Sequence, residues 1–189
     1  ALQTRAVAQN AESLYRSKYD FVAGNPKGNV TVVEFFDYNC GFCKRALGDI
    51  VKLINTDDQV RVVFKELPIF GKPSEETAKL ALASIEQGKY MEYHVELLKS
   101  PGRMTKARAL KIAEKLGLDV EKLQKDVETP KIEAALAANR TLANNIGLQG
   151  TPLYLVGDQI IPGAPEDLYD QLMSHVKQIR TKGCRVAAC

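Results

Sequence analysis

Apolar residues along the chain change their spacing several times, and each change predicts a different element. The range 30–36 reads VTVVEFF, a nearly continuous apolar run that is typical of a strand buried on both faces. From Cys43 to Ile54 the apolar positions follow helical spacing, and 59–67, QVRVVFKEL, predicts a second strand that Pro68 stops. Strand, helix and strand in this order predict a βαβ unit.

The middle of the chain keeps helical spacing throughout. Ser74, followed by Glu75 and Glu76, predicts an N-cap with acidic residues in the first helical turn. Further helices are expected around 91–98, around 109–116, from Asp119, and from Thr129-Pro130 to about Gly147.

Strand patterns return near the C-terminal end of the chain. Residues 152–156 and 159–161 flank a Gly157-Asp158 turn, which is a β-hairpin pattern, and 166–181 predicts a closing helix. The order βαβ, helical block, ββα predicts an α/β protein, a thioredoxin fold with an inserted all-helical domain. The expected units are an N-terminal helical segment at 1–18, a thioredoxin-like domain at 19–70 and 147–182, the inserted domain at 71–146 and a C-terminal tail at 183–189.

The N-terminal segment carries only a thin apolar stripe. Val7, Ala11 and Leu14 keep helical spacing within a polar, alanine-rich stretch. A short helix of this kind is marginally stable in isolation. We therefore expect it to need a partner chain, and we expect a short edge strand at 20–22 to follow it.

Composition narrows the classes of function. The chain has 189 residues, of which 45% are hydrophobic and 26% charged, as in a globular domain with a sizeable core. Its net charge of +3 is too small to indicate nucleic acid or an anionic membrane as a partner. No apolar run approaches the roughly 20 residues of a membrane-spanning helix. No basic stretch followed by an apolar one opens the chain, so a secretory signal was removed or was never present.

Cys40 and Cys43 enclose Gly41-Phe42 at the turn from the first strand into the helix. Backbone N–H groups of a first helical turn point toward a sulfur in this position. The helix dipole contributes about 0.3–1 kcal/mol, less than the ~1.36 kcal/mol of one pKa unit, so a larger depression of the pKa needs hydrogen bonds from Phe42 or Cys43. We predict Cys40 as the nucleophile and Cys43, one turn further on, as the buried resolving thiol.

Two other kinds of site also use a CxxC pair. A structural disulfide does not need a helix start that attracts anions, and a zinc site would need Cys184 and Cys189 as its remaining ligands. Redox chemistry without a metal or an organic cofactor is therefore the favoured interpretation. Cys184 and Cys189 are instead expected to form a structural disulfide that pins the C-terminal tail.

Further candidate residues lie near the cysteine pair. Glu34, within VTVVEFF, would be buried at considerable cost unless it is paired or protonated, and Lys65 of the second strand is the expected partner. Such a pair either serves structure alone, or Glu34 relays protons to and from Cys43. Thr151-Pro152 precedes a strand that should neighbour the first, and a cis peptide bond is compatible with that place. Residues 37–39 either modulate the site or are ordinary polar loop residues.

Taken together, these motifs resemble a known family. VVEFFDYNCGFCKRAL, VFKELPIFG and GLQGTPLYLVGDQIIPGA resemble the DsbA-like branch of the thioredoxin superfamily, and most of all its ScsC-like and Com-type secreted thiol–disulfide oxidoreductases. The resemblance implies a periplasmic location, a nucleophilic Cys40 with a resolving Cys43, a buried Glu34 matched by Lys65, and a cis-proline at Pro152. It further implies cysteine-containing exported proteins as substrates and a redox partner in the membrane.

The sequence departs from the best-known DsbA oxidases, which carry Pro-His between the cysteines and Val before the cis-proline. Gly41-Phe42 and Thr151 look closer to the periplasmic isomerases. We therefore expect an isomerase or reductase, with a dithiol oxidase as the alternative. The rivals are a glutathione-dependent kappa-type enzyme, which usually lacks the second cysteine, and a copper- or zinc-binding redox-linked module. ScsC-like relatives often carry an oligomerising N-terminal stalk, and residues 1–18 fit a remnant of one, which would make the protein a homo-oligomer.

Overall fold

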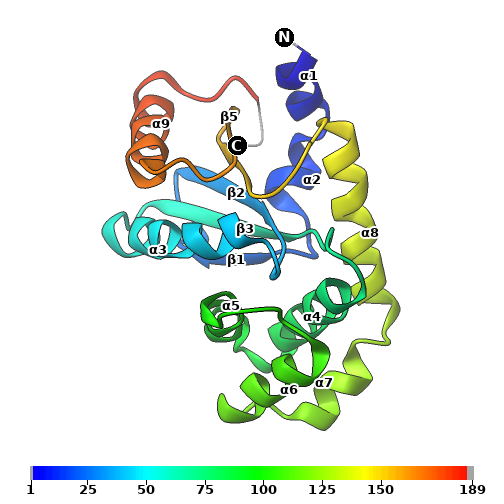
Figure 1. Ribbon diagram of the computed structural model, residues 1–189. Helices are drawn as coiled ribbons and strands as arrows, with labels where there is room; N and C mark the ends of the chain where they lie inside the picture. The colour runs from blue at the N-terminus through cyan, green and yellow to red at the C-terminus, as the bar shows by residue number, and fades with distance from the viewer. Residues whose placement is uncertain (1, 187–189) are drawn as a thin grey trace.

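The predicted strands form one mixed sheet. In the computed structural model, which describes residues 2–186, the strand order is β1-β3-β2-β4-β5 (Figure 1). The parallel strands β2 and β3 are joined by helix α3, and the other neighbouring strands run antiparallel. The βαβ unit and the C-terminal hairpin are thus confirmed. The bounds are β1 Phe21–Gly24, β2 Val30–Phe36, α3 Gly41–Thr56, β3 Val60–Glu66, β4 Leu153–Val156 and β5 Gln159–Pro162.

The register of β2 on β3 decides which residues share a face of the sheet. All residues of both strands are buried, as their apolar runs predict. Glu34 pairs with Phe64 of β3 and with Tyr154 of β4, whereas Phe35 pairs with Lys65. Successive residues of a strand point to opposite faces. Glu34 and Lys65 therefore lie on different faces of the sheet.

A helical block separates β3 from β4 and lies at one end of the molecule (Figure 1). Helix α7 begins where the sequence predicts it, and the Asp119 side chain caps it. Within residues 2–186, no helix is long and apolar enough to span a bilayer. The elements of the block are α4 Lys72–Ala83, the 3-10 helix η1 Ser84–Gln87, α5 Tyr90–Lys99, α6 Lys106–Lys115, α7 Val120–Asp126 and α8 Pro130–Asn145.

The prediction that Ser74 caps the first of these helices is wrong. Helix α4 begins at Lys72, with Gly71 as its N-cap residue and a proline in the first turn. Proline is favoured there because its fixed φ suits a helix and its missing N–H has no intrahelical partner to lose. The Ser74 hydroxyl instead donates a hydrogen bond of 2.7 Å to Asp37, just before the cysteine pair.

Helices cover both faces of the sheet. Helices α3 and α9 (Leu168–Lys182) pack on the face that carries Val32 and Phe36. On the other face lie α1 (Leu2–Gln9), α2 (Ala11–Arg16) and the end of α8. The apolar stripe of the N-terminal segment is buried there, against Val33 and Phe35. The sheet of the same chain therefore supplies a packing partner for a stripe that the sequence assigned to a second chain.

The predicted disulfide of the C-terminal tail falls at the edge of the described structure. Helix α9 ends at Lys182, and Cys184 follows two residues later. Cys189 lies outside the described residues. The Cys184–Cys189 pairing therefore stays a prediction, as do the limits given above for the separate domains.

Candidate active site

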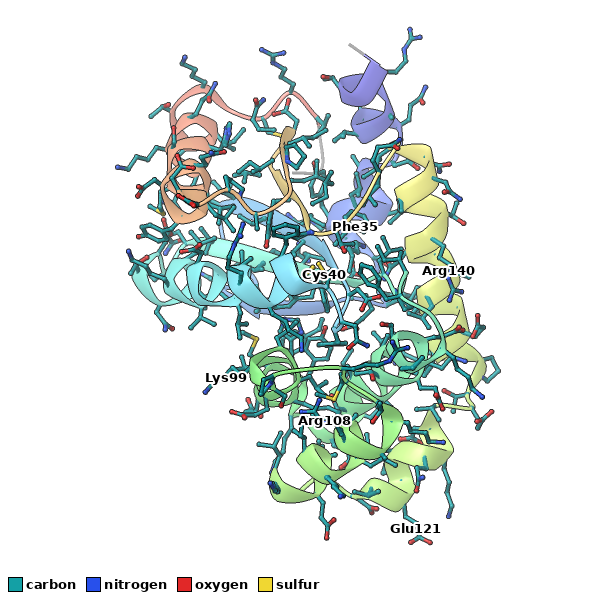
Figure 2. All side chains as sticks on the ribbon, in the orientation of Figure 1. Phe35, Cys40, Lys99, Arg108, Glu121 and Arg140 are labelled. Atoms are coloured by element: carbon teal, nitrogen blue, oxygen red, sulfur yellow. The ribbon has the colours of Figure 1, made fainter. Side chains whose placement is uncertain are left out.

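Cys40 lies at the start of α3, in the middle of the molecule (Figure 2). After β2 the chain turns through a hydrogen bond of 3.1 Å from the Cys40 N–H to the Asp37 carbonyl. Cys40 is thereby the N-cap residue of α3, and its sulfur accepts a hydrogen bond of 3.2 Å from the Cys43 N–H. The first N–H groups of a helix have no intrahelical partner, and this sulfur satisfies one of them. The helix start that the sequence predicts for Cys40 is confirmed.

The two thiols differ strongly in acidity. Both are buried and free. Hydrogen bonding from Cys43 lowers the pKa of Cys40 to about 6, against the opposing effect of burial. Burial raises the pKa of Cys43, and hydrogen bonding to Cys40 and the charge of Glu34 act in the same direction. Near neutral pH, one cysteine is therefore largely a thiolate while the other is a thiol.

Glu34 lies beneath the pair, on the face of the sheet that α3 covers. Its side chain is buried, with 2% of the residue exposed, and it accepts a hydrogen bond of 2.6 Å from the Tyr154 hydroxyl. Burial raises the pKa of Glu34 to about 8, the Tyr154 hydrogen bond opposes this, and the charge of Cys40 adds to it. At neutral pH Glu34 is thus mostly a neutral acid, close enough to both sulfurs to affect their pKa values.

The expected pairing of Glu34 with Lys65 is wrong. Lys65 lies on the opposite face of the sheet because it stands in register with Phe35. Its ammonium group forms an ion pair of 2.6 Å with Asp20 and donates a hydrogen bond of 2.7 Å to the Ser13 carbonyl. Lys65 therefore holds the N-terminal segment and does not belong to the cysteine site.

The loop before β4 completes the surroundings of Cys40. The Thr151–Pro152 peptide bond is cis, as the resemblance implied. The Cys40 thiol donates to the Thr151 carbonyl at 3.4 Å, while the Thr151 hydroxyl is buried without a hydrogen-bond partner in the described range. Beside this loop lies an open groove of about 520 Å³ whose walls include Phe42, Pro152 and Ile160. Phe42 is 57% exposed, so an apolar ring stands on the surface between the two cysteines in sequence.

Two side chains next to the pair hold the helical block against it. The Asn39 side chain accepts a hydrogen bond of 2.6 Å from the Met104 N–H and donates one of 3.1 Å to the Met104 carbonyl. The Lys44 ammonium group donates to the carbonyls of Ser100 and Gly102, at 2.8 Å and 2.7 Å. The inserted block is thus bonded directly to the residues on either side of the CxxC pair.

A second buried carboxyl lies near the site, at a position that the sequence patterns did not single out. Glu66, the last residue of β3, accepts hydrogen bonds from the hydroxyls of Tyr38, at 2.8 Å, and Tyr90. The Tyr38 hydroxyl also lies 2.9 Å from Nδ1 of His94. Burial raises the pKa of Glu66 well above its usual range and lowers that of His94 to about 3, so both are neutral. The available signal was a second acidic residue inside an apolar strand pattern.

Metal ligands do not gather around this site. In the part of the chain that the structure describes, no three His, Cys, Asp or Glu side chains are placed to share a metal ion.

Several solved structures share this fold over nearly the whole chain. A thioredoxin-like oxidoreductase from Silicibacter pomeroyi DSS-3 is 42% identical, with a TM-score of 0.88, over 91% of this chain and 98% of that one. The thiol–disulfide exchange protein alpha-DsbA2 from Wolbachia pipientis is 29% identical, with a TM-score of 0.86, over 93% and 95%. The catalytic domain of ScsC from Proteus mirabilis is 26% identical, with a TM-score of 0.85, over 95% and 99%.

The curated relatives are much longer proteins. They are Na(+)/H(+) antiporters of the NhaA type, and the one from Salinispora tropica is 30% identical over 139 residues. The match covers 72% of this chain but only 21% of that antiporter. This chain thus spans about a fifth of the length of the curated relatives that it matches.

The family model for the DSBA-like thioredoxin domain matches residues 31–177. This range begins within β2, includes the CxxC pair and the helical block, and ends within α9. The sequence match and the structural matches agree on the same architecture. The chain therefore belongs to the DSBA-like thioredoxin domain family.

Proposed function

We propose that this chain exchanges thiols and disulfides with cysteines of exported proteins, with Cys40 as the nucleophile and Cys43 as the resolving thiol. The observation that carries the proposal is the Cys40 sulfur at the start of α3, where hydrogen bonding from Cys43 lowers its pKa to about 6. A thiolate is the form that attacks a disulfide, and a thiol of this pKa is largely ionised at neutral pH.

The exchange proceeds in two steps, formation of a mixed disulfide and its resolution. The Cys40 thiolate attacks one sulfur of a substrate disulfide, so that a mixed disulfide forms and one substrate thiolate leaves. Cys43 then loses its proton and attacks the Cys40 sulfur, which releases the second substrate thiolate and leaves a Cys40–Cys43 disulfide. The substrate gains two electrons and the protein loses two. In the reverse direction the same steps oxidise a substrate dithiol.

The second step needs a base, because burial raises the pKa of Cys43. Glu34 is the proposed proton acceptor, since it is buried near both sulfurs and burial raises its own pKa to about 8. A carboxyl with this pKa exchanges protons readily near neutral pH. Tyr154 orients it through the 2.6 Å hydrogen bond. No lysine takes part in this relay.

The direction of exchange is proposed to favour isomerisation or reduction. The dipeptide Gly41-Phe42 places no cationic or hydrogen-bonding side chain between the cysteines. The reduced form therefore gains less stabilisation than it would with a histidine there, and the disulfide is a weaker oxidant. The exposed Phe42 and the groove beside the Pro152 loop suit an extended, apolar stretch of a substrate chain.

The location and partners of the chain are proposed from its likeness to secreted members of the family. Exported proteins with cysteines are the substrates, and a membrane protein is the redox partner that restores the working redox state of the pair. The apolar side chains of the proposed stalk remnant at 1–18 are already buried against the sheet of the same chain. Oligomerisation through this segment would therefore use its other residues.

The test compares two assays on the same protein. Insulin reduction measures reductase activity, and refolding of scrambled ribonuclease measures isomerase activity; both are expected to be present in the parent and absent in Cys40→Ser. Phe42→His is expected to make the redox potential against glutathione less negative, where about 30 mV corresponds to a tenfold change in the equilibrium. A parent that oxidises reduced peptides as fast as Phe42→His, and does not refold scrambled ribonuclease, would contradict the proposed direction.

A further inference from the structure

Asp37 is a buried acid that the two-step exchange does not use. It follows β2 directly, three residues before Cys40, and only 2% of it is exposed. Its carboxylate accepts four hydrogen bonds from groups on three separate segments. The donors are the Asn39 N–H at 2.6 Å and the Ser74 hydroxyl at 2.7 Å on Oδ1, and the Ile69 and Phe70 N–H groups at 2.7 Å and 3.1 Å on Oδ2.

All four partners of this carboxylate are donors. Each oxygen accepts two of them, and an ionised carboxylate is the form with acceptor capacity alone. Hydrogen bonds to a charged acceptor are also about twice as strong as those between neutral groups. The arrangement therefore holds a negative charge in a buried place, fixed by the cysteine segment, by the loop after β3 and by the first turn of α4.

The backbone of Asp37 reaches the cysteines as well. Its carbonyl accepts the hydrogen bond from the Cys40 N–H at 3.1 Å, and its own N–H interacts with the Cys43 sulfur. The charged and titratable groups that interact with Cys40 include Asp37, Cys43, Glu34 and Tyr154. Among them, Asp37 alone joins the pair to the loop and to the helical block by side-chain hydrogen bonds.

We propose that Asp37 is a positioning residue that sets the redox poise of the pair: its carboxylate ties the cysteine segment to the loop at 69–70 and to α4, and its charge weakens the disulfide as an oxidant. This inference rests on the proposed thiol–disulfide exchange. A negative charge near Cys40 disfavours the thiolate and so the reduced form, and a pair with a less stable reduced form is less oxidising.

The Asp37 carboxylate also fixes a loop that carries two exposed apolar side chains. Ile69 and Phe70 are 46% and 49% exposed, and their N–H groups are fixed by Asp37. Without those two hydrogen bonds, the loop that carries both side chains keeps the bond from the Leu67 N–H to the Phe36 carbonyl but loses its attachment to Asp37. Asp37 therefore couples the chemistry of the pair to the shape of the surface next to it.

Asp37→Asn tests the charge and the attachment together. The amide oxygen can still accept from Asn39 and Ser74, but the amide nitrogen cannot accept from Ile69 and Phe70. We expect the pH midpoint of Cys40 alkylation to fall by about one unit or less. We expect the equilibrium with glutathione to shift about three- to tenfold toward the reduced protein, which is the same free-energy change. Hydrogen exchange at the Ile69 and Phe70 amides should become faster.

The direction of the midpoint separates this role from a merely structural one. A carboxylate that only kept Cys40 at the helix start would, once removed, let the sulfur lose its N–H partner, and the midpoint would rise. Ser74→Ala removes one donor and keeps the charge, so its midpoint should not fall, and a fall would contradict the role of the charge even if Asp37→Asn does not fold. Asp58→Asn, an exposed carboxylate change, is the matched control and should alter neither readout.

The experiment distinguishes a failure of the proposed role of Asp37 from a failure of the proposed function. If the parent shows no exchange with glutathione and no low alkylation midpoint, the proposed function fails. If the parent is active but Asp37→Asn leaves the midpoint unchanged or raises it, the role of Asp37 is refuted. A fall in the midpoint of Ser74→Ala would refute it as well.

Discussion

The two faces of the sheet bury an acidic and a basic side chain in different ways. On the α3 face, the Tyr154 hydroxyl is the only side-chain hydrogen-bonding partner of Glu34 among residues 2–186, and burial keeps Glu34 mostly neutral. On the face of the N-terminal helices, Lys65 is paired with Asp20 at 2.6 Å and donates to a backbone carbonyl. A buried charge with a matched partner serves structure, whereas a buried acid without a countercharge is free to gain and lose a proton. The face with the unmatched acid is the one that carries the cysteines.

The largest expected effect is a loss of stability on the face of the sheet that the N-terminal helices cover. Lys65→Met leaves Asp20 buried without its countercharge, and removal of one partner of a buried ion pair costs about 3–5 kcal/mol. The free energy of unfolding in urea should fall by that amount. The alkylation midpoint of Cys40 should stay within error of the parent, because Lys65 lies on the other face.

The double variant Asp20→Asn with Lys65→Met is the control for this pair. It removes both charges, so it should recover part of the stability that Lys65→Met loses. A Lys65→Met protein with parental stability and a shifted Cys40 midpoint would show that the two faces are not separate in function.

The next effect is on the pH dependence of stability. The pKa of Glu34 is raised to about 8 in the fold, so its contribution to stability is fully present below its ordinary value of 4.5 and is lost as the pH rises toward 8. Cys40, with its pKa lowered to about 6 from 9, contributes in the opposite sense, and this part is lost as the pH falls through 6. In the Cys40→Ala background we therefore expect the contribution of Glu34 to stability to decline by about 2–4 kcal/mol between pH 5 and pH 8.

The comparison that isolates Glu34 is Cys40→Ala with and without Glu34→Gln. Unfolding in urea at several pH values should give a declining curve for the first and a flatter one for the second. Parallel curves would mean that Glu34 does not titrate in this range.

Individual residues show how much of the difference between the two faces could be predicted from the sequence. The apolar run of β2 and the CxxC at its end were sufficient to predict the βαβ unit and the place of Cys40, because both are local patterns. The pairing of Glu34 was not predictable in this way, since a shift of one residue between β2 and β3 moves Lys65 to the other face. Register depends on the contacts of the whole sheet. For Asp37 the sequence left two interpretations open, a modulator of the site or an ordinary polar loop residue, because three of its four donors lie more than 30 positions away along the chain.

A smaller effect is expected on the rate at which Cys43 resolves the mixed disulfide. Glu34→Gln keeps a hydrogen-bonding group for Tyr154 but removes the proton acceptor of Cys43. General acid–base catalysis contributes about 100-fold or more in favourable cases, and we expect resolution of the mixed disulfide to slow by about 10–100-fold. Stopped-flow release of a fluorescent peptide thiol from its mixed disulfide measures this step directly.

Glu66→Gln is the matched control, because Glu66 is the other buried carboxyl with tyrosine partners. Its hydrogen bonds lie toward Tyr38 and Tyr90, and it should slow release by no more than about twofold. If both variants slow the step equally, a general loss of packing explains the result better than proton transfer at Glu34.

The smallest effect is expected at Thr151. Its carbonyl accepts from Cys40 at 3.4 Å when Cys40 is protonated, in any variant. Its buried hydroxyl has no hydrogen-bond partner in the described structure and is available to donate to Cys40 when Cys40 is a thiolate. Thr151→Val removes that donor with little change in shape, so the alkylation midpoint of Cys40 should rise by less than about one unit and the potential should become slightly more negative. Thr151→Ser keeps the hydroxyl and should match the parent. If Ser and Val behave alike, the hydroxyl is not used, and the loop acts on Cys40 through its backbone carbonyl alone.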